Sequence, residues 1–182
     1  MAPDAPRILI VRLSSIGDVI HGLPVLCALR ERFPQAFLGW VVEGRGVDLL
    51  RGHEALNELI QVPRGWLKSP GAVVALRRRL RDLRFDLALD LQGLAKSAIA
   101  GWLSGAKRRI GFAPPAAREC GHWLYTDLVP PTATHVVDRT LELLKPLGLE
   151  RPAVRFAIPQ PAAVEATVAG WFGERLLPDR FA

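Results

Sequence analysis

The residues best suited to chemistry lie in one short stretch, residues 13–18, with the sequence LSSIGD. Gly17 allows a tight backbone turn, and Asp18 places a carboxylate at the beginning of an expected helix. Asp is among the preferred helix N-caps, and this is the role favoured on physical grounds alone. The alternative role is a general base that takes a proton from a substrate hydroxyl. The positive end of the helix dipole counts against that role, because it lowers the pKa of a nearby carboxylate.

His21 follows Asp18 by three positions, on the same face of the expected helix, and could hold the carboxylate in place. A lone histidine is more often simply part of the hydrogen-bonded structure. The stretch has neither the GxGxxG of dinucleotide-binding folds nor the GxxxxGK[ST] of phosphate-binding loops, so neither kind of cofactor is predicted. The two cysteines, Cys27 and Cys120, have no His or Cys at metal-ligand spacing, and we expect no bound metal.

Basic side chains form a second group of candidates. The chain has 24 Lys and Arg against 18 Asp and Glu, a net charge of +6, and an isoelectric point near 10.1. This balance predicts an anionic partner: a nucleic acid, a charged membrane surface, or a phosphorylated or carboxylated substrate. One expected helix carries a basic run, Arg77, Arg78, Arg79, Arg81 and Arg84. We interpret Arg78 and Arg79 as a solvated helix face, and the absence of interleaved aromatic residues disfavours a single-stranded nucleic-acid platform.

Other basic residues fall in expected loops, where side chains contact ligands more often than in helices. Arg64 and Lys68 belong to a loop that follows one expected strand. Lys96 comes shortly after the turn Gln92-Gly93, which follows another expected strand. If the strands are parallel, both loops lie at the edge of the sheet where ligands bind.

Short apolar runs alternate with helix-periodic segments along most of the chain. The expected strands are 7–11, 37–42, 59–62, 85–90 and 109–112, and the expected helices run from Asp18 to Phe33 and over 73–83, 93–104 and 135–144. Pro24 is expected either to kink the first helix or to start its longer part. This alternation predicts an α/β fold with a doubly wound, mostly parallel sheet.

The composition is that of an ordinary globular domain. Hydrophobic residues make up 49% and charged residues 23% of the chain, which excludes disorder, collagen-like repeats and coiled coil. The first apolar run, 8–11, is too short for a signal peptide, and no uncharged apolar run approaches the roughly 18 residues of a membrane span. We therefore expect a cytoplasmic protein. After Arg151 the pattern weakens, with one possible helix over 162–172.

The opening of the chain resembles a known family. Residues 7–21, RILIVRLSSIGDVIH, followed by Leu23-Pro24, are similar to the beginning of the lipopolysaccharide heptosyltransferases of glycosyltransferase family nine, most closely the type I enzymes. Three further segments keep the order found in the family: 90–97 (DLQGLAKS), 117–119 (ARE) and 135–140 (HVVDRT). The resemblance covers nearly the whole chain.

The resemblance implies a GT-B glycosyltransferase, in which two Rossmann-like domains face a cleft and the N-terminal domain holds the acceptor. The reaction it implies transfers heptose from ADP-L-glycero-D-manno-heptose to the first Kdo of Kdo–lipid A, with inversion and without a metal. Matching positions make Asp18 the catalytic base, with His21 and Gln92 in support. The acceptor-binding positions implied are Ser15, Gly17, Arg64, Lys68, Lys96, Arg118 and Arg139.

Length is the main departure from the family. We expect residues 1–150 to form the acceptor-binding domain and 151–182 to lead toward a donor-binding domain that this sequence lacks. The chain is then either a fragment or the partner of a separate donor domain. The positive charge suits an acceptor with carboxylates and phosphates and an anionic inner-membrane surface, without any nucleic acid. The alternative is a non-catalytic α/β module that binds an anionic glycolipid or a polynucleotide.

Overall fold

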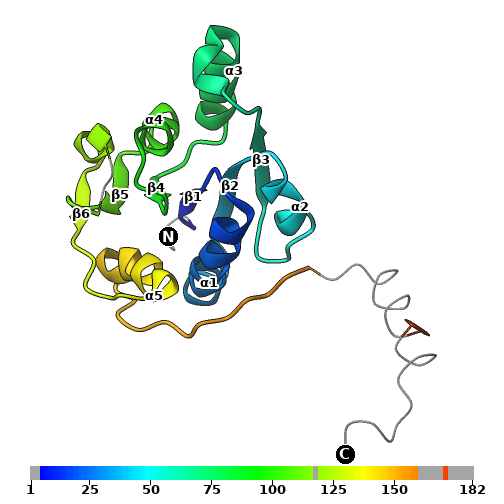
Figure 1. Ribbon diagram of the computed structural model, residues 1–182, viewed down its shortest axis with the longest axis vertical. Helices are drawn as coiled ribbons and strands as arrows, with labels where there is room; N and C mark the ends of the chain where they lie inside the picture. The colour runs from blue at the N-terminus through cyan, green and yellow to red at the C-terminus, as the bar shows by residue number, and fades with distance from the viewer. Residues whose placement is uncertain (1–4, 117–118, 160–169, 172–182) are drawn as a thin grey trace, which may run out of the picture.

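A parallel sheet forms the centre of the computed structural model, which describes residues 5–116, 119–159 and 170–171 (Figure 1). Its six strands lie in the order β3-β2-β1-β4-β5-β6, and every neighbouring pair is parallel. The strands are β1 (Arg7–Val11), β2 (Phe37–Glu43), β3 (Glu58–Val62), β4 (Leu87–Asp90), β5 (Arg108–Phe112) and β6 (Asp127–Val129). The predicted doubly wound, Rossmann-like α/β fold is confirmed.

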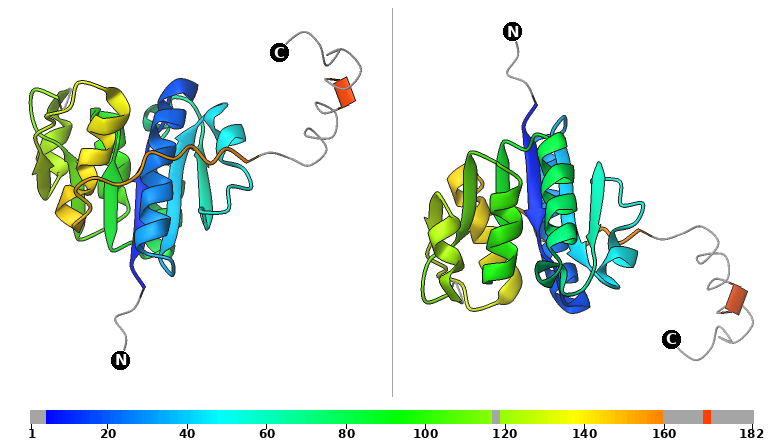
Figure 2. Two further views of the ribbon diagram at one scale, coloured as in Figure 1. Left: turned by 90° about the horizontal axis from the view of Figure 1, so that it is seen from below. Right: turned by 90° about the horizontal axis from the view of Figure 1, so that it is seen from above.

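Helices cover both faces of the sheet (Figure 2). One face carries α1 (Ile16–Arg32), α2 (Gly46–Leu50) and α5 (Val136–Leu141), and the other carries α3 (Pro70–Asp82) and α4 (Ala95–Leu103). Short 3₁₀ helices complete the set: η1 (Trp66–Lys68), η2 (Glu119–Leu124) and η3 (Glu142–Leu147). Parallel strands need crossover connections, so the carboxyl ends of all the strands lie at the same edge of the sheet. The loops that follow β1, β2, β3 and β4 at this edge are 12–15, 44–45, 63–65 and 91–94.

Two apolar cores explain why the first strand lacks an alternating pattern. Ile8 and Ile10 pack toward α1 and α5, whereas Leu9 and Val11 pack toward α3 and α4. Each of these side chains is at most 1% exposed, so both faces of β1 demand apolar residues. The result is a rigid central strand whose carboxyl end is fixed within the sheet.

The helix boundaries correct several expectations. Pro24 lies inside a helix that already begins at Ile16, so it does not start the longer part of that helix. The helix expected over 135–144 ends as α5 at Leu141 and continues as the 3₁₀ helix η3, which contains Pro146. The strand β6 and the short helix α2 were not predicted, because neither has enough residues to show a hydrophobic period.

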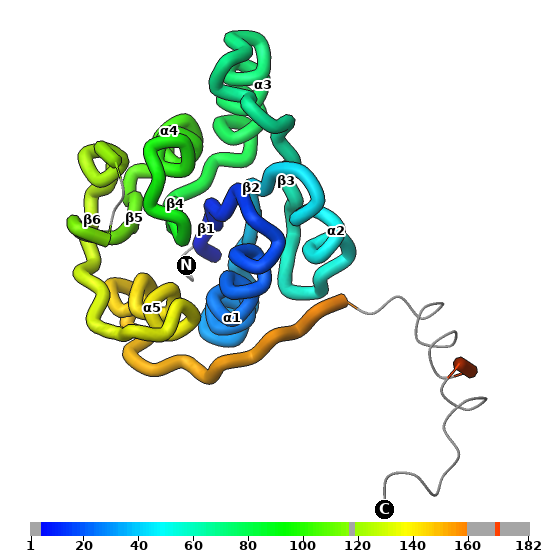
Figure 3. The backbone as a smooth tube through the Cα atoms, in the orientation of Figure 1, coloured from blue at the N-terminus to red at the C-terminus, as the bar shows by residue number. Residues whose placement is uncertain are grey.

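Residues 151–159 run as an extended segment beside α1 toward the loop after α2 (Figure 3). Residues 149–153 line a hollow together with Ala28 and Arg32 of α1, and Ala157 and Ile158 line another with His53. Most of the helix expected over 162–172 lies outside the described residues. Within the described part of the chain, no helix is both long and apolar enough to cross a membrane.

Candidate functional site

A cavity of about 240 Å³ opens at the carboxyl edge of the sheet, beside the ends of β1 and β4. Chain order reverses between these two strands, since β2 and β3 lie on one side and β5 and β6 on the other. This is the position at which doubly wound sheets bind ligands. The polar residues that line the cavity are Arg12, Asp18, Gln92, Arg139 and Thr140, and the walls include Leu91, Phe112 and Val136.

Asp18 lies in the first turn of α1, but it is not the N-cap. Ser15 is the N-cap, and Asp18 occupies the third helical position. Its Oδ2 accepts a hydrogen bond of 2.9 Å from the backbone N–H of Ser15, and the Ser15 hydroxyl lies 3.3 Å from the same oxygen. The expected N-cap role is therefore replaced by a reciprocal capping contact. The side chain remains 39% exposed, so it is accessible from the cavity.

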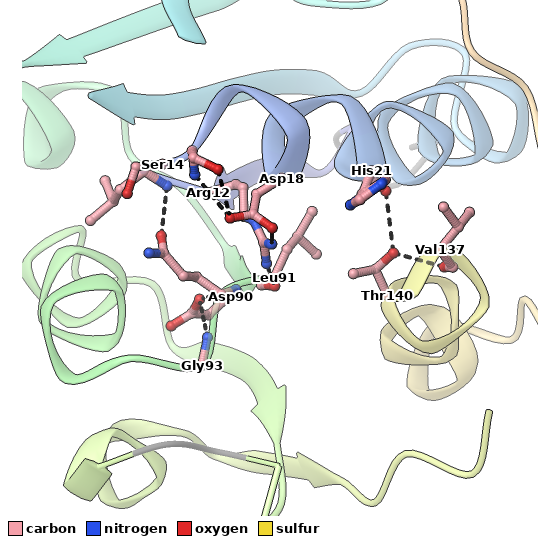
Figure 4. Close-up of polar contacts among 12 residues, drawn as sticks. Arg12, Ser14, Asp18, His21, Asp90, Leu91, Gly93, Val137 and Thr140 are labelled. Carbon is pink, nitrogen blue, oxygen red and sulfur yellow. Dashed lines mark hydrogen bonds and ion pairs between the residues drawn. The ribbon is translucent and has the colours of Figure 1, made fainter. Parts of the chain in front are cut away.

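The second carboxylate oxygen of Asp18 faces a cation. Arg12 Nη2 lies 2.6 Å from Asp18 Oδ1, and Figure 4 shows these two side chains facing each other. Partial burial raises the pKa of Asp18, but the Ser15 amide and the Arg12 guanidinium together outweigh burial and hold the pKa below its usual value. Asp18 is therefore ionised at neutral pH.

Arg12 is a site residue that sequence reasoning missed. Its guanidinium is buried, and Nη1 donates a hydrogen bond to the carbonyl of Leu91, directly after β4. In the sequence, Arg12 cannot be distinguished from an ordinary polar residue that ends a strand. The available signal was a basic residue between the apolar run 8–11 and the LSSIGD stretch.

Gln92 contacts the loop that precedes α1. Its Oε1 accepts a hydrogen bond of 2.8 Å from the backbone N–H of Leu13. Gln92 is itself positioned by a turn, because Asp90 Oδ1 accepts hydrogen bonds from the N–H groups of Gln92 and Gly93. Gly93 has φ +71°, a conformation that favours glycine. The ends of β1 and β4 are thus tied together.

Lys96 reaches the same loop from α4. Its Nζ lies 3.1 Å from Glu43 Oε2 and 3.4 Å from Ser14 Oγ. Glu43, at the end of β2, is 8% exposed and was not predicted as a site residue. The Glu43 carboxylate partly neutralises the Lys96 ammonium and holds it beside the loop that precedes α1. Any anion that Lys96 binds would share it with Glu43.

Arg139 enters the cavity from α5. In the described part of the chain, no hydrogen bond or ion pair occupies its guanidinium, which leaves it available for an anion. The hydroxyl of the neighbouring Thr140 donates a hydrogen bond of 2.7 Å to the Val137 carbonyl and also lies 3.3 Å from the His21 carbonyl, where α5 meets α1. The His21 ring makes no hydrogen bond to Asp18, and its Nδ1 is buried without a partner among the described residues. The supporting role expected of His21 is not seen.

The remaining candidates lie outside the cavity. Gly17 lies within the first turn of α1, and open space surrounds the position of a Cβ, so no tight turn requires glycine there. Arg64 and Lys68 are exposed after β3, with the Arg64 guanidinium close to Gly44 at the end of β2. Arg118 lies outside the described residues. Among residues 5–116, 119–159 and 170–171, no three His, Cys, Asp or Glu side chains gather as a metal site.

A sequence model described as glycosyltransferase family 9 (heptosyltransferase) matches residues 73–167, just over half of the chain. The chain belongs to glycosyltransferase family 9. It is 30% identical over 162 residues to the lipopolysaccharide core heptosyltransferase OpsX of Haemophilus influenzae, covering 86% of this chain and 46% of the relative. It is 33% identical over 168 residues to lipopolysaccharide heptosyltransferase 1 of Escherichia coli K12, covering 85% of this chain and 52% of the relative.

Solved structures agree with this family membership. The Escherichia coli heptosyltransferase WaaC with ADP is 33% identical, with a TM-score of 0.73 over 84% of this chain and 51% of that chain. WaaC with ADP-2-deoxy-2-fluoro heptose is 30% identical, with a TM-score of 0.74 over 95% of this chain and 56% of that chain. The chain spans about half the length of these family 9 relatives.

Proposed function

We propose that this chain is the acceptor-binding half of an inverting lipopolysaccharide heptosyltransferase. The observation that carries the proposal is the ionised Asp18 carboxylate, held in a cavity that also presents the free guanidinium of Arg139. A base beside a cation suits an acceptor sugar that carries a hydroxyl nucleophile and an anionic group. Kdo, a carboxylated sugar, has both, and the named relatives act in lipopolysaccharide synthesis.

The proposed reaction uses ADP-L-glycero-D-manno-heptose as donor. Asp18 accepts the proton of a Kdo hydroxyl while that oxygen bonds to the anomeric carbon of heptose from the face opposite ADP. The bond between that carbon and the ADP oxygen breaks, the oxygen keeps the electron pair, and the anomeric centre inverts. The ADP and ADP-2-deoxy-2-fluoro heptose named with the WaaC structures support this donor class. The proposal includes no metal or other cofactor.

The other basic residues divide by their surroundings. Arg139 is the main proposed contact for the Kdo carboxylate, and Lys96 is a secondary contact because Glu43 already pairs with it. Ser15 and Gly17 shape the approach to Asp18. Arg64 and Lys68, exposed along the same edge, are proposed to meet the more distant phosphates of lipid A, and Arg118 is assigned with them from its position in the sequence.

Residues 1–150 form the acceptor domain in this proposal, and residues from 151 onward lead to the donor domain. The whole enzyme works in the cytoplasm at the inner face of the inner membrane. The net charge of +6 supports that location, because anionic lipid attracts a basic protein surface.

Calorimetry on the purified 182-residue chain tests the proposal. We expect Kdo–lipid A to bind and ADP to give no measurable heat. Transfer from ADP-heptose should require the second half of the Escherichia coli relative, added in trans or fused to this chain, because one side of a cleft cannot hold both reactants in a reactive geometry.

Two outcomes would contradict the proposal. Tight ADP binding or transfer by the isolated chain would put the donor site in this half. Binding that ignores sugar structure, responds equally to heparin and falls steeply with salt would instead indicate a non-catalytic polyanion-binding module.

A further inference from the structure

Arg12 occupies an unusual position for a charged side chain. Its side chain is 9% exposed, although it leaves the carboxyl end of the central strand beside an open cavity. Burying a guanidinium is unfavourable unless its donors are paired. Nη1 is paired with the Leu91 carbonyl and Nη2 with Asp18 Oδ1, whereas Nε is buried and has no hydrogen-bond partner among the described residues. The side chain therefore joins the end of β4 to the first turn of α1.

The two partners of Arg12 differ in how deeply they are buried. Leu91 follows β4 directly and is 0% exposed, so its carbonyl is fixed by the sheet. Asp18 projects from a helix end and is partly exposed. A planar guanidinium holds two acceptors at a fixed separation and angle. Ser15 holds Oδ2 of Asp18 within the helix, and Arg12 ties Oδ1 to the end of the sheet.

We propose that Arg12 is the positioning residue of this site: it fixes the Asp18 carboxylate relative to the Leu91 carbonyl, so that the carboxylate stays at the wall of the cavity. The inference rests on the proposed function, in which Asp18 takes the acceptor proton. In this inference Arg12 acts on the reaction only through its contact with Asp18.

The other charged groups near the cavity do not duplicate this contact. Arg139 comes from α5 across the cavity, and Lys96 from α4 is engaged with Glu43 and Ser14. His21, one turn along α1, makes no hydrogen bond to Asp18. In the described part of the chain, Arg12 and Ser15 alone form hydrogen bonds or ion pairs with the Asp18 carboxylate.

The chain offers a matched control in Arg30, near the other end of α1. Its guanidinium is also largely engaged in structure, with hydrogen bonds to the carbonyls of Pro34, Ala36 and Ala55 and to the Asn57 side chain. Replacing Arg30 removes a comparable set of structural contacts far along the helix from Asp18. Loss of fold stability and loss of positioning can therefore be separated.

NMR titration of the Asp18 side-chain carboxyl in the 182-residue chain tests the contact directly. We expect Arg12→Gln to move the Asp18 titration to higher pH, Arg12→Lys to restore part of the original position, and Arg30→Gln to leave it unchanged while lowering the melting temperature. Arg12→Lys keeps a buried cation, so it serves if Arg12→Gln does not fold. An Asp18 titration that is the same in wild type, Arg12→Lys and Arg12→Gln would overturn the inference.

Transfer assays on the chain fused to the second half of the Escherichia coli relative supply the kinetic readout. Arg12→Gln should lower kcat roughly 10- to 100-fold with little change in the acceptor KM, because displacement of a reacting group by about 1 Å costs about that much. The acidic side of the plot of kcat against pH should also move to higher pH in Arg12→Gln. If Asp18→Asn abolishes transfer while Arg12→Gln keeps full kcat, the inference on Arg12 fails and the proposed function stands. If Asp18→Asn keeps full transfer, the proposed base fails, whatever the titration shows.

Discussion

Two aspartates near the ends of the neighbouring strands β1 and β4 have opposite surroundings. Asp18 is partly exposed, faces the cavity and pairs with Arg12 at 2.6 Å. Asp90 is 3% exposed, and its oxygens accept two backbone N–H groups and the Tyr125 hydroxyl, the last at 2.6 Å. One carboxylate has a cationic partner and an open side, whereas the other has only neutral donors and is enclosed.

The pKa values follow from this difference. Burial raises the pKa of Asp90 more than the hydrogen bonds from Tyr125 and the turn amides lower it. Burial also acts to raise the pKa of Asp18, but the hydrogen bonds from Ser15 and the charge of Arg12 together lower it by more. A carboxylate near a strand end is therefore a candidate catalytic base when it has a cationic partner and faces an open cavity. Asp90, which lacks both, organises the turn that carries Gln92.

The largest expected effect is on turnover. In the chain fused to a family donor domain, Asp18→Asn should reduce the transfer rate by about 10² to 10⁴, because the side chain keeps its shape and loses the basic oxygen. Acceptor affinity, measured by calorimetry, should change little. Turnover close to wild type would mean that Asp18 only caps the helix and is, like Asp90, a structural carboxylate.

Asp90 should show its effect in stability instead. Asp90→Ala leaves the Tyr125 hydroxyl and two turn amides without their acceptor, and we expect a loss of about 2–4 kcal/mol in the free energy of unfolding. Urea denaturation measures it, and Asp18→Ala should cost only about 1 kcal/mol in the same experiment. An equal loss at both positions would mean that the two carboxylates are structural to the same degree.

A pH series on Asp90→Asn sharpens this result. Asn keeps an acceptor for the turn and a polar group for Tyr125, so the loss should be smaller than for Ala. Because folding raises the pKa of Asp90, wild-type stability from this group is greatest at low pH and declines as pH rises through the folded pKa. The uncharged Asn variant should therefore gain relative to wild type as pH rises.

Arg139 lines the same cavity as Asp18 and has no ion-pair partner among the described residues. Arg139→Ala should weaken Kdo–lipid A binding by about 1.5–3 kcal/mol, the contribution of a hydrogen bond to a charged group. Arg78→Ala, on the exposed face of α3, should change binding negligibly. Titration calorimetry with both variants decides between a defined anion contact and diffuse electrostatics, which would give equal losses.

The smallest expected effect is the change in stability on replacing Glu142, whose carboxylate pairs with Lys145 outside the cavity. Burial acts to raise the pKa of Glu142, yet the Thr132 hydroxyl, the Lys145 ammonium and the amides of Thr132 and Ala133 lower it from 4.5 to about 2. Its contribution to stability is complete above pH 4.5 and is lost as pH falls toward 2. Glu142→Gln should cost about 1–2 kcal/mol at pH 7, a difference that shrinks in acid. If the difference persists at pH 2, the charge of Glu142 is not its source.

The fold was largely predictable because the strongest signals are local. The run 7–11 matches β1 residue for residue, and the leucines of 73–83 place the buried face of α3 through Leu76 and Leu80. The exposed positions of Arg78 and Arg79 confirm the solvated helix face. β6 has three residues and one buried side chain, Val129, so no sequence period could reveal it.

The candidate site was less predictable, because its contacts join distant parts of the chain. Asp18, Gln92 and Arg139 were proposed from motifs, and the structure places all three on one cavity. Arg12 and Glu43 were missed. Glu43 is recognisable only through Lys96, 53 positions away, and the contact that buries Arg12 joins it to Leu91, 79 positions away, although its place directly before the LSSIGD stretch was a local signal. Asp18 was given the wrong capping position because Ser15, three residues earlier, competes for that role.

The cavity draws its walls from residues 12–18, 91–94, 112–116 and 136–140, and these segments meet only when β1, β4, β5 and α5 are all in place. Contacts between segments so far apart in the chain form slowly and late in folding. No partly folded chain that lacks α5 can present the complete pocket. A molecule that binds there therefore opposes unfolding of every layer at once, and its presence should raise the melting temperature of the whole domain in proportion to the logarithm of its concentration. Occupancy of the site is in this sense a measure of how completely the chain has folded.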